Sequence, residues 1–542
     1  MRPLDWVVLC AWLVLLISYG LWRSRGSNTV NQFLLAGKTM PWYAMGLSIM
    51  ATQAGAITFI STPGQAYVDG MRFVQLYLGL PIAMVILAAT VVPIFHRAKV
   101  YTAYEYLEQR FDAKTRALVS IIFLIERGLS AGVALAAPGI VLSAILQIPF
   151  FWTTILMGVI VILFTTIGGI KAITWADVPQ MIVIFSALLL ALFMAIRLLP
   201  PDVSFLDAAR LAGAAGKLNA IVTHFDWKDR YNLASGLIGG TFLALAYFGT
   251  DQSQVQRYLT GKSIGQSRLS LLFNAMAKVP MQFLILFIGA MVFVFFLFDK
   301  PPLIFNPIDA KNVSPALESR YAAAFTERRA AAIEYSHTPS AEPKFQAAQK
   351  NLDAVRADAL KLTTESDTNY IFLTFVMHYL PEGIVGLVLA VIFTASMSSS
   401  SGEINSLATV TVIDIYKRHI HPNAPDHHYL MASRAATIFW GAFATIFATF
   451  AYNFGALIEA VNQVGSLFYG GLLGVFVLAF FAKRVRGTAA FYGVIAGELA
   501  IFVTARFTSI KFLWYNVIGS LVVIAVALAI SATRSTRDTL NT

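Results

Sequence analysis

The sequence has little charge and almost no cysteine. Only 13% of its 542 residues are charged, about half the share of a soluble domain, whereas 57% are hydrophobic. The single cysteine, Cys10, lies in the first apolar run, so no disulfide framework exists. All eight histidines lie in or near polar loops. This argues against an enzyme acting within a membrane, because such catalysis needs His, Asp or Cys near the bilayer centre.

Long apolar runs recur along the whole chain, each close to the roughly 20 residues of a membrane-spanning helix. They are continuous and do not alternate as barrel strands do, so the sequence predicts an all-α polytopic membrane protein. Arg23 and Arg25 follow the first run without a small-residue cleavage site, which indicates a retained helix and not a signal peptide. The thirteen predicted transmembrane helices are 5–22, 42–67, 73–95, 117–147, 151–168, 177–198, 232–250, 267–298, 382–415, 429–452, 455–481, 488–506 and 512–532.

The net charge of +11 comes from basic residues in short loops between these runs. That distribution is typical of membrane topology signals and excludes a nucleic-acid surface. Lys and Arg gather in alternate loops, which by the positive-inside rule face the cytoplasm. With thirteen helices, the N-terminus is then expected outside and the C-terminus inside the cell inner (plasma) membrane.

One stretch, residues 299–367, is polar and rich in Ala, Glu, Lys and Arg. Its composition favours two helices broken near "SHTPSAEP", residues 336–343. We predict an extracytoplasmic helical hairpin here, with a disordered loop as the alternative.

A run of hydroxyls stands out in the predicted helix 382–415. Ser398, Ser399 and Ser401 fall near its middle, in four consecutive serines that are followed by Glu403 and Asn405. One or two helix serines can bond back to their own carbonyls, but so many polar groups exceed what packing requires. Hydroxyl and carbonyl oxygens are hard ligands that suit Na⁺. The serine run therefore indicates a cation site.

The predicted helix 42–67 contains three glycines, a proline and several small polar residues. This pattern indicates one of two structures. The helix is either interrupted, so that freed carbonyls line a cavity, or packed closely on its neighbours through small residues.

These segments resemble motifs of the sodium:solute symporter family in order and spacing, over essentially the whole chain apart from 299–367. The segments are "SIMATQAGAITFISTPGQAY" (48–67), "TAYEYLEQRFD" (102–112), "GGIKAITWADVPQ" (168–180), "DQSQVQRYL" (251–259) and "SMSSSSGEINSLATVTVIDIYKR" (396–418). Bacterial sialic acid transporters and animal monocarboxylate and vitamin transporters of that family are most similar in motif.

The resemblance implies the LeuT-type fold, in which two five-helix repeats of inverted topology form the core. The implied parts are 1–41, a leading helix and cytoplasmic loop; 42–298, the first repeat and the start of the second; 299–367, the insertion; 368–481, the rest of the second repeat; and 482–542, two trailing helices.

The resemblance also implies Na⁺ ligands. The first Na⁺ of the family lies between the helices matching 42–67 and 382–415, and the matching residues are Ala51, Ala54, Ala395, Ser398 and Ser399. Some members bind a second Na⁺, for which Asp177 and Ser401 match, but Gly402 stands where the family has a further hydroxyl. Asp177 could instead cap a helix N-terminus.

The solute is expected near mid-membrane. By resemblance, its candidate contacts are Thr58, Phe73, Gln75, Ser130, Tyr247, Phe248 and Lys278. In sodium–galactose transporters an aromatic residue matching Tyr247 covers the sugar, but the acidic residue of their third helix is missing here. Sialic acid transporters hold a carboxylate with an arginine where this chain has Ser130. The solute class therefore stays open among sugars, sialic acids, monocarboxylates, amino acids and vitamins.

Four charged residues are expected within the membrane, where charges are usually functional or paired. They are Glu126, Arg127, Lys278 and Glu403. We expect Glu126 and Arg127 to form an interfacial pair with a snorkelling stem.

Glu403 has three conceivable partners: a second Na⁺ shared with Asp177 and Ser401, a basic side chain such as Arg127, or solvent. It lies about 140° round the helix from Ser398. We therefore predict a structural ion-pair or vestibule residue and not a Na⁺ ligand.

Together these features predict a sodium-coupled secondary active transporter that imports a small organic solute by alternating access. Na⁺ is the expected cofactor, and the solute and the lipid bilayer are the expected partners, with no nucleic acid and no obligate protein partner. A transporter-like sensor and a membrane-embedded enzyme are the alternatives. A sensor would be expected to carry an appended signalling domain, and only ten residues follow the last predicted helix.

Overall fold

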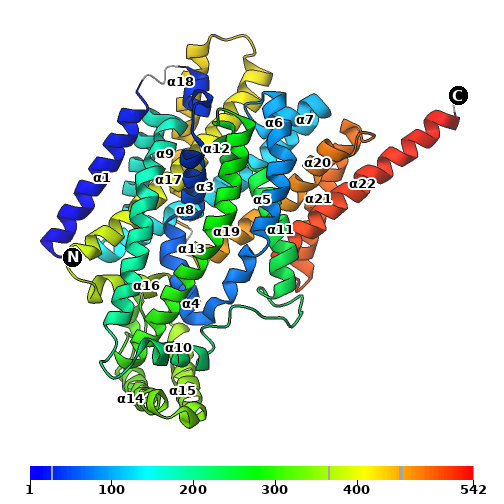
Figure 1. Cartoon of the computed structure of the whole chain (residues 1–542). Helices are drawn as coiled ribbons and strands as arrows, with labels where there is room; N and C mark the ends of the chain where they lie inside the picture. The colour runs from blue at the N-terminus through cyan, green and yellow to red at the C-terminus, as the bar shows by residue number, and fades with distance from the viewer. Residues whose placement is uncertain (26–28, 364–365, 451–455, 541–542) are drawn as a thin grey trace.

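The computed structural model describes residues 1–25, 29–363, 366–450 and 456–540. In this part of the chain the fold is all-helical, and long helices run side by side in one bundle (Figure 1). The helices are α1 (Pro3–Arg23), α2 (Val30–Leu35), α3 (Trp42–Gln53), α4 (Ala56–Asp69), α5 (Leu80–Ala89), α6 (Val91–Ala98), α7 (Ala103–Arg110), α8 (Ala113–Leu146), α9 (Phe150–Arg197), α10 (Phe205–Ala214), α11 (Gly240–Gly249), α12 (Gln252–Leu259), α13 (Ile264–Phe298), α14 (Pro315–His337), α15 (Glu342–Leu360), α16 (Thr368–Tyr379), α17 (Ile384–Val410), α18 (Asp426–Ala448), α19 (Leu457–Ser466), α20 (Tyr469–Phe481), α21 (Gly487–Phe507) and α22 (Leu513–Leu540).

The predicted transmembrane segments fall on helical parts of the described chain, but several are divided. Segment 42–67 falls on α3 and α4, segment 73–95 falls on α5 and α6 after a 3-10 stretch (Gly70–Tyr77), and segment 455–481 contains α19 and α20. Residues 451–455 lie outside the described residues.

The two predicted helices 151–168 and 177–198 both fall on α9, which ends at Arg197. Its 48 residues would measure about 72 Å as one straight helix, far more than a bilayer needs. The direction changes at Gly169, whose φ of 57° and ψ of −167° suit glycine. The second half of α9 therefore begins seven residues earlier than predicted.

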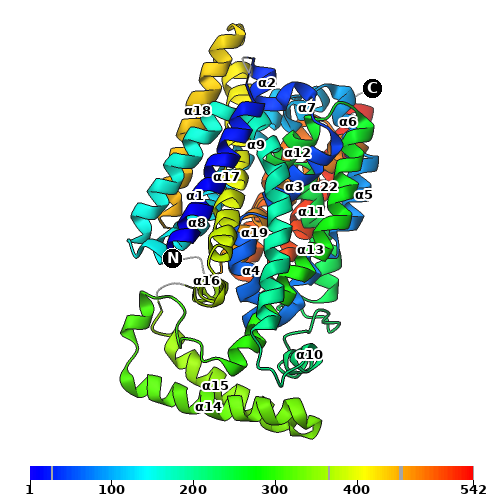
Figure 2. The ribbon, with the colours of Figure 1, turned by 60° about the vertical axis from the view of Figure 1, so that its left-hand side comes forward.

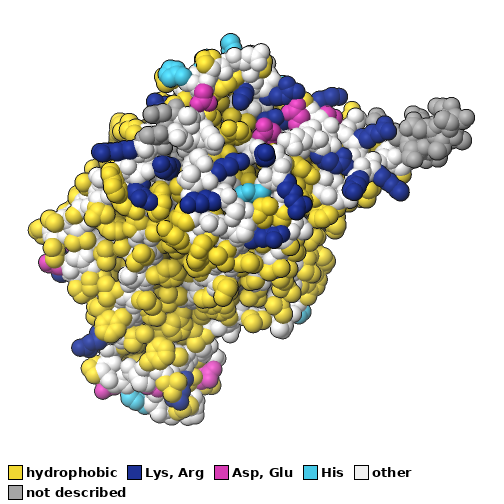
Figure 3. All heavy atoms as spheres, turned by 45° about the horizontal axis from the view of Figure 1, so that its top comes forward, with side chains coloured by type: hydrophobic (Ala, Val, Ile, Leu, Met, Phe, Trp, Pro, Cys, Tyr) yellow, Lys and Arg dark blue, Asp and Glu magenta, His cyan; other side chains and the backbone are white. Residues whose placement is uncertain are grey.

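Side chains set where the helices begin and which faces they bury. Asp112 caps α8 by accepting a hydrogen bond from the backbone N–H of Thr115 (2.8 Å), which satisfies an otherwise unpaired donor. Large apolar side chains such as Val14 on α1, Ile182 on α9 and Phe439 on α18 are exposed. Figure 3 shows such side chains as a continuous hydrophobic belt, which is the surface expected of a chain immersed in lipid.

Helix α17 is enclosed by other helices, and Figure 2 shows it beside α1. It packs on α1, α3, α4, α8, α9, α12 and α18, and nearly all of its side chains are buried. The serine run of the sequence therefore lies in the protein interior and not against lipid.

The insertion 299–367 contains the two predicted helices, α14 and α15. A short turn at Pro339–Ala341 separates them, within the predicted break, and they pack on each other at the end of the molecule opposite the C-terminus (Figures 1 and 2). Buried Arg328 joins the hairpin to the bundle by donating to the carbonyl oxygen of Phe296 (2.6 Å). Arg356 pairs with Asp367 at 2.7 Å. The alternative of a disordered loop is wrong for the described residues.

Because α14 and α15 lie outside the bundle, replacing residues 315–360 with a flexible Gly/Ser linker should preserve transport. The linker keeps the segments on either side of the hairpin, including Asp367, which accepts hydrogen bonds from the N–H groups of Phe305 (2.6 Å) and Asn306 (2.9 Å). The measurement is Na⁺-driven uptake by reconstituted protein, with the full chain as control. Complete loss of uptake in a folded, inserted variant would show that the hairpin is part of a gate or an assembly surface.

Candidate functional site

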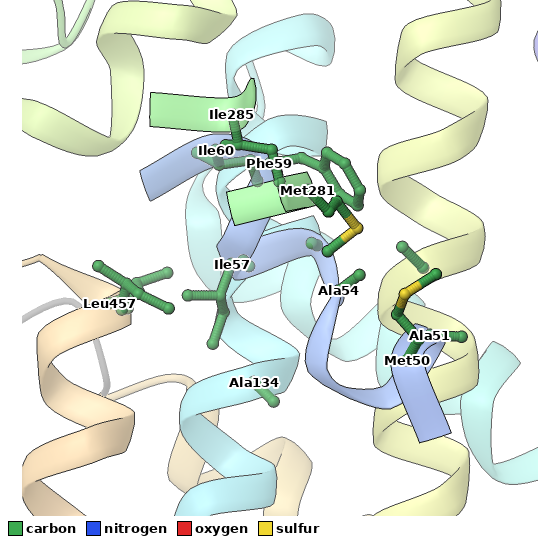
Figure 4. Close-up of a cluster of buried hydrophobic side chains, with 14 of the residues drawn as sticks. Met50, Ala51, Ala54, Ile57, Phe59, Ile60, Ala134, Met281, Ile285 and Leu457 are labelled. Carbon is green, nitrogen blue, oxygen red and sulfur yellow. The ribbon is translucent and has the colours of Figure 1, made fainter. Parts of the chain in front are cut away.

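The candidate site is built around a break between α3 and α4. Ala54 (φ −95°, ψ 43°) and Gly55 (φ −68°, ψ 176°) leave the helical conformation, and α4 starts at Ala56. Of the two structures that the sequence left open for 42–67, the interrupted helix is the one that the structure shows. Figure 4 shows the chain changing direction between Ala51 and Ile57, with Ala54 at the bend. A helix end leaves its last carbonyl oxygens without helical partners, so the break exposes acceptors within the membrane.

The break lies directly against the serine run of α17. A Cβ atom placed on Gly55 would lie 2.8 Å from the Oγ of Ser399 and 3.9 Å from the carbonyl oxygen of Ala395. Ser399 Oγ donates to that same carbonyl at 3.0 Å. The Ser399 hydroxyl and the Ala395 carbonyl of α17 thus lie directly against the break, where a Cβ at position 55 would crowd the hydroxyl.

Asp177 connects α9 to this place. Its Oδ1 accepts a hydrogen bond from Ser398, and its Oδ2 accepts one from Ser48 (2.5 Å) on α3. The carboxylate also forms an ion pair with Arg257 of α12 at 3.0 Å. Asp177 lies inside a continuous helix, eight residues after Gly169, so its interpretation as an N-cap is wrong.

Gly402 accommodates the Arg257 guanidinium. A Cβ at position 402 would overlap Nη2 of Arg257, so a serine there would compete with the arginine for space. Ser401 is buried, and its Oγ has no hydrogen-bond partner among the described residues. The structure therefore joins Asp177 to Ser398 and pairs it with a cationic side chain.

A cavity opens from the break towards α11, α17, α19 and α20. The residues lining it are Thr52, Gln53, Gly55, Ile57, Thr58, Leu76, Tyr77, Leu80, Arg127, Ala134, Gly240, Leu243, Ala244, Tyr247, Phe248, Ser399, Glu403, Ile458, Val461, Asn462 and Tyr469. Because Ser399 and Gly55 belong to its wall, a small molecule inside would share that wall with an ion bound at the break.

Arg127 holds together four elements at this cavity. It pairs with Glu403 of α17 at 3.2 Å and with Asp251, which precedes α12. It also donates to the hydroxyl of Tyr469 (2.5 Å) on α20 and lies 3.5 Å from Glu126 of its own helix. Buried charges are costly unless they are paired, and these contacts provide the pairing.

The neighbouring charges Glu126 and Arg127 of α8 both lie in the protein interior. Arg127 is only 2% exposed and Glu126 is fully buried, so the expected interfacial pair with a snorkelling stem is wrong. The reason is that α8 lies inside the bundle, where Arg127 has polar partners on other helices. The predicted ion pair of Glu403 is confirmed, and its partner is Arg127.

Comparison with known proteins identifies this architecture. The model of the sodium:solute symporter family matches residues 33–321 and 351–497. The chain belongs to that family. Relatives include a sodium/glucose cotransporter of Vibrio parahaemolyticus, 26% identical over 96% of this chain and 89% of the relative, and the sodium/sialic acid symporter NanT of Aliivibrio fischeri, 26% identical over 96% and 92%. The sodium-dependent multivitamin transporter of Oryctolagus cuniculus is 27% identical over 92% of this chain and 69% of the relative.

The fold agrees with this assignment. A solved structure of a Na⁺-coupled sialic acid symporter, in a substrate-bound outward-open state, superposes with a TM-score of 0.77, covers 98% of both chains and is 24% identical. The expected LeuT-type fold is thereby confirmed. This chain is therefore a symporter, a multi-pass membrane protein that couples Na⁺ to the transport of a small organic solute. Its family contains transporters, so the alternative of a membrane-embedded enzyme is wrong.

Of the seven expected solute contacts, three line the cavity and four do not. Thr58, Tyr247 and Phe248 lie in the cavity wall. Lys278 lies behind the wall, where its Nζ donates to the carbonyl oxygen of Gln53 (3.3 Å).

The other three expected contacts are engaged elsewhere. Phe73 packs edge-on against the ring of Tyr231 at 5.2 Å between centroids. The amide of Gln75 fastens a loop by donating to the carbonyl of Tyr231 (2.9 Å) and accepting from the N–H of Val222 (3.0 Å). Ser130 donates to Glu126 at 3.0 Å.

Sequence reasoning missed Asp251, Arg257, Asn462 and Tyr469. Asp251 and Arg257 belong to "DQSQVQRYL", a segment between the predicted helices 232–250 and 267–298. In the structure α12 is buried and packs against α17 and α3. Val255, Tyr258 and Leu259 have helical spacing, which could have indicated an amphipathic helix. The burial of its polar residues as well had no such signal.

Proposed function

We propose that this symporter imports its solute together with Na⁺ bound at the α3–α4 break, and that the solute occupies the adjoining cavity. The proposed Na⁺ ligands are the carbonyl oxygens of Ala51, Ala54 and Ala395 and the hydroxyl oxygens of Ser398 and Ser399. The contact of Gly55 with Ser399 and Ala395 carries this proposal, because it sets the oxygens of α17 beside the end of α3.

The chemistry of these donors suits Na⁺. Carbonyl and hydroxyl oxygens are hard, neutral ligands, and a site without a carboxylate ligand is charged only when the ion is present. Asp177 lies behind Ser398 and orients its hydroxyl. With its carboxylate paired to Arg257, it contributes to the proposed site as a positioning residue.

Coupling follows from the shared wall. Ser399 belongs both to the proposed ion site and to the cavity, and Thr58 Oγ1 reaches back across the break to the carbonyl of Gln53 at 2.8 Å. An ion that orders the break therefore also fixes the wall that contacts the solute. By linkage, the solute must raise the affinity for Na⁺ by the same factor.

The charge distribution supports an orientation in the plasma membrane. Figure 3 shows Lys and Arg side chains gathered at the end that holds the C-terminus, above the hydrophobic belt. Basic residues mark the cytoplasmic side. The C-terminus is then cytoplasmic, and the α14–α15 hairpin, at the other end in Figure 1, lies outside. Helix α1 then begins on the outer side of its membrane crossing.

A stability screen followed by transport tests the proposal. Solutes that bind the folded state raise stability by RT ln(1 + [L]/Kd), about 2.7 kcal/mol at 100 Kd, so stabilisation in NaCl but not KCl identifies both solute and ion. Proteoliposomes should then accumulate that solute only under an inward Na⁺ gradient. Equal accumulation driven by protons without Na⁺ would refute the proposal.

A further inference from the structure

The charges in the cavity wall are unbalanced. Arg127 and Glu403 are the charged side chains among the described residues that line the cavity. Arg127 is surrounded by three carboxylates, those of Glu126, Asp251 and Glu403, so one positive group faces three acidic ones. Its two terminal nitrogens are engaged by these partners, whereas its Nε has no hydrogen-bond partner among the described residues. A negatively charged solute would still meet a surplus of acidic groups around this one cation.

One carboxylate oxygen of Glu403 has no hydrogen-bond donor among the described residues. This oxygen is Oε2, whereas Oε1 pairs with Arg127 at 3.2 Å. The side chain is 6% exposed, so bulk water does not compensate it. A buried acceptor without a donor costs free energy, and a donor brought by a molecule in the cavity would remove that cost.

The remaining wall suits an apolar body that carries a positive charge. Leu243, Ile458 and Val461 are aliphatic, and Tyr247 and Phe248 present aromatic rings. Aromatic faces attract cations, and the Tyr247 ring already lies 5.4 Å from the Arg127 guanidinium carbon. Lys278 is behind Gln53 and Tyr77, outside the lining.

We propose that the transported solute carries a protonated nitrogen on a largely apolar body, and that Glu403 Oε2 accepts a hydrogen bond from it. This inference rests on the proposed function, since it places the solute in the cavity beside the Na⁺ site. It makes Glu403 a specificity-determining residue. Ser399 and Glu403 are four residues apart on α17, so they share one face, and ion and solute would bind one helical turn apart.

The first test uses solutes that share one body. Purified protein in NaCl is titrated with 2-phenylethylamine, phenylalanine, 2-phenylethanol and 3-phenylpropionate. A second series carries the same functional groups on a butyl chain in place of the phenylethyl group. Thermal unfolding is followed for each compound. Compounds with a protonated nitrogen should half-saturate at concentrations at least ten-fold lower than their alcohol or carboxylate counterparts. A panel in which no amine stabilises the protein, or in which the carboxylates bind best through Arg127, overturns the proposal.

The second test assigns the selectivity to Glu403. Glu403→Gln keeps an acceptor for Arg127 but removes the charge, and should reduce the preference for the amine at least ten-fold. The matched control is Glu126→Gln, which removes a carboxylate from the same cluster but not from the cavity wall, and should retain the preference. If Glu403→Gln does not fold, Glu403→Asp replaces it, and should bind the amine more weakly while still preferring it.

Stabilisation by Na⁺ alone, without any solute, separates this inference from the proposed function. Glu403→Gln should keep that stabilisation with nearly unchanged half-saturation. If wild-type protein shows no response to Na⁺, the proposed ion site fails and not the assignment of Glu403. If Glu403→Gln folds normally but needs far more Na⁺, the carboxylate binds the ion, which overturns its assignment to the solute.

Discussion

Replacing Ser399 with alanine should raise the Na⁺ concentration for half-maximal transport at least several-fold while the protein stays folded. Its hydroxyl lies at the break, against Gly55, and makes only local bonds to backbone carbonyls of α17, at 3.0 Å and 3.2 Å. Losing such bonds costs about 1 kcal/mol of stability. Losing one of five proposed ligands, however, weakens ion binding directly.

Ser398→Ala should weaken Na⁺ binding as well, with a larger loss of stability. The Ser398 hydroxyl donates to Asp177, so the variant also removes a donor from a buried carboxylate, at a cost of roughly 1–3 kcal/mol. Ser400→Ala is the control on the same helix, because the Ser400 Oγ is buried without a hydrogen-bond partner among the described residues. The measurement is initial uptake rate against Na⁺ concentration. Unchanged Na⁺ dependence in both variants would rule out the site.

Arg257→Gln should be among the most destabilising single substitutions in this symporter. Arg257 and Asp177 are both fully buried and 3.0 Å apart, so removing the cation leaves an uncompensated carboxylate in the protein interior. Breaking such a pair costs roughly 3–5 kcal/mol. We expect low expression and a strongly lowered unfolding temperature in detergent.

The double variant Asp177→Asn with Arg257→Gln should recover much of this loss. Two neutral amides still hydrogen-bond, and no buried charge is left without a partner. Recovery is measured as a double-mutant cycle in unfolding temperature at fixed Na⁺ concentration. If Arg257→Gln alone is as stable as the wild type, or is rescued by high Na⁺, then Asp177 holds a cation in place of the arginine.

Much of the fold follows from local sequence. Apolar runs of sufficient length must become helices in lipid, because every backbone polar group there needs an internal partner. Gly55 interrupts the second predicted helix where the sequence places it, and Pro339 lies in the turn between α14 and α15. These features depend on neighbouring residues, so periodicity and composition reveal them.

Apart from Glu403 with Arg127, which the sequence offered as one alternative, the pairing of buried charges depended on tertiary structure. Arg127 meets Asp251 across 124 residues, and Asp177 meets Arg257 across 80. Hydropathy places α12 outside the membrane helices, yet α12 folds inward against α17 and brings Asp251 and Arg257 with it.

Sequence by itself determined the helices, the glycine-containing segment at the break and the serine run, because these arise from local chemistry. Which charge neutralises which was decided by helix packing, since a buried ion pair needs two side chains that only the folded bundle brings within about 4 Å of each other.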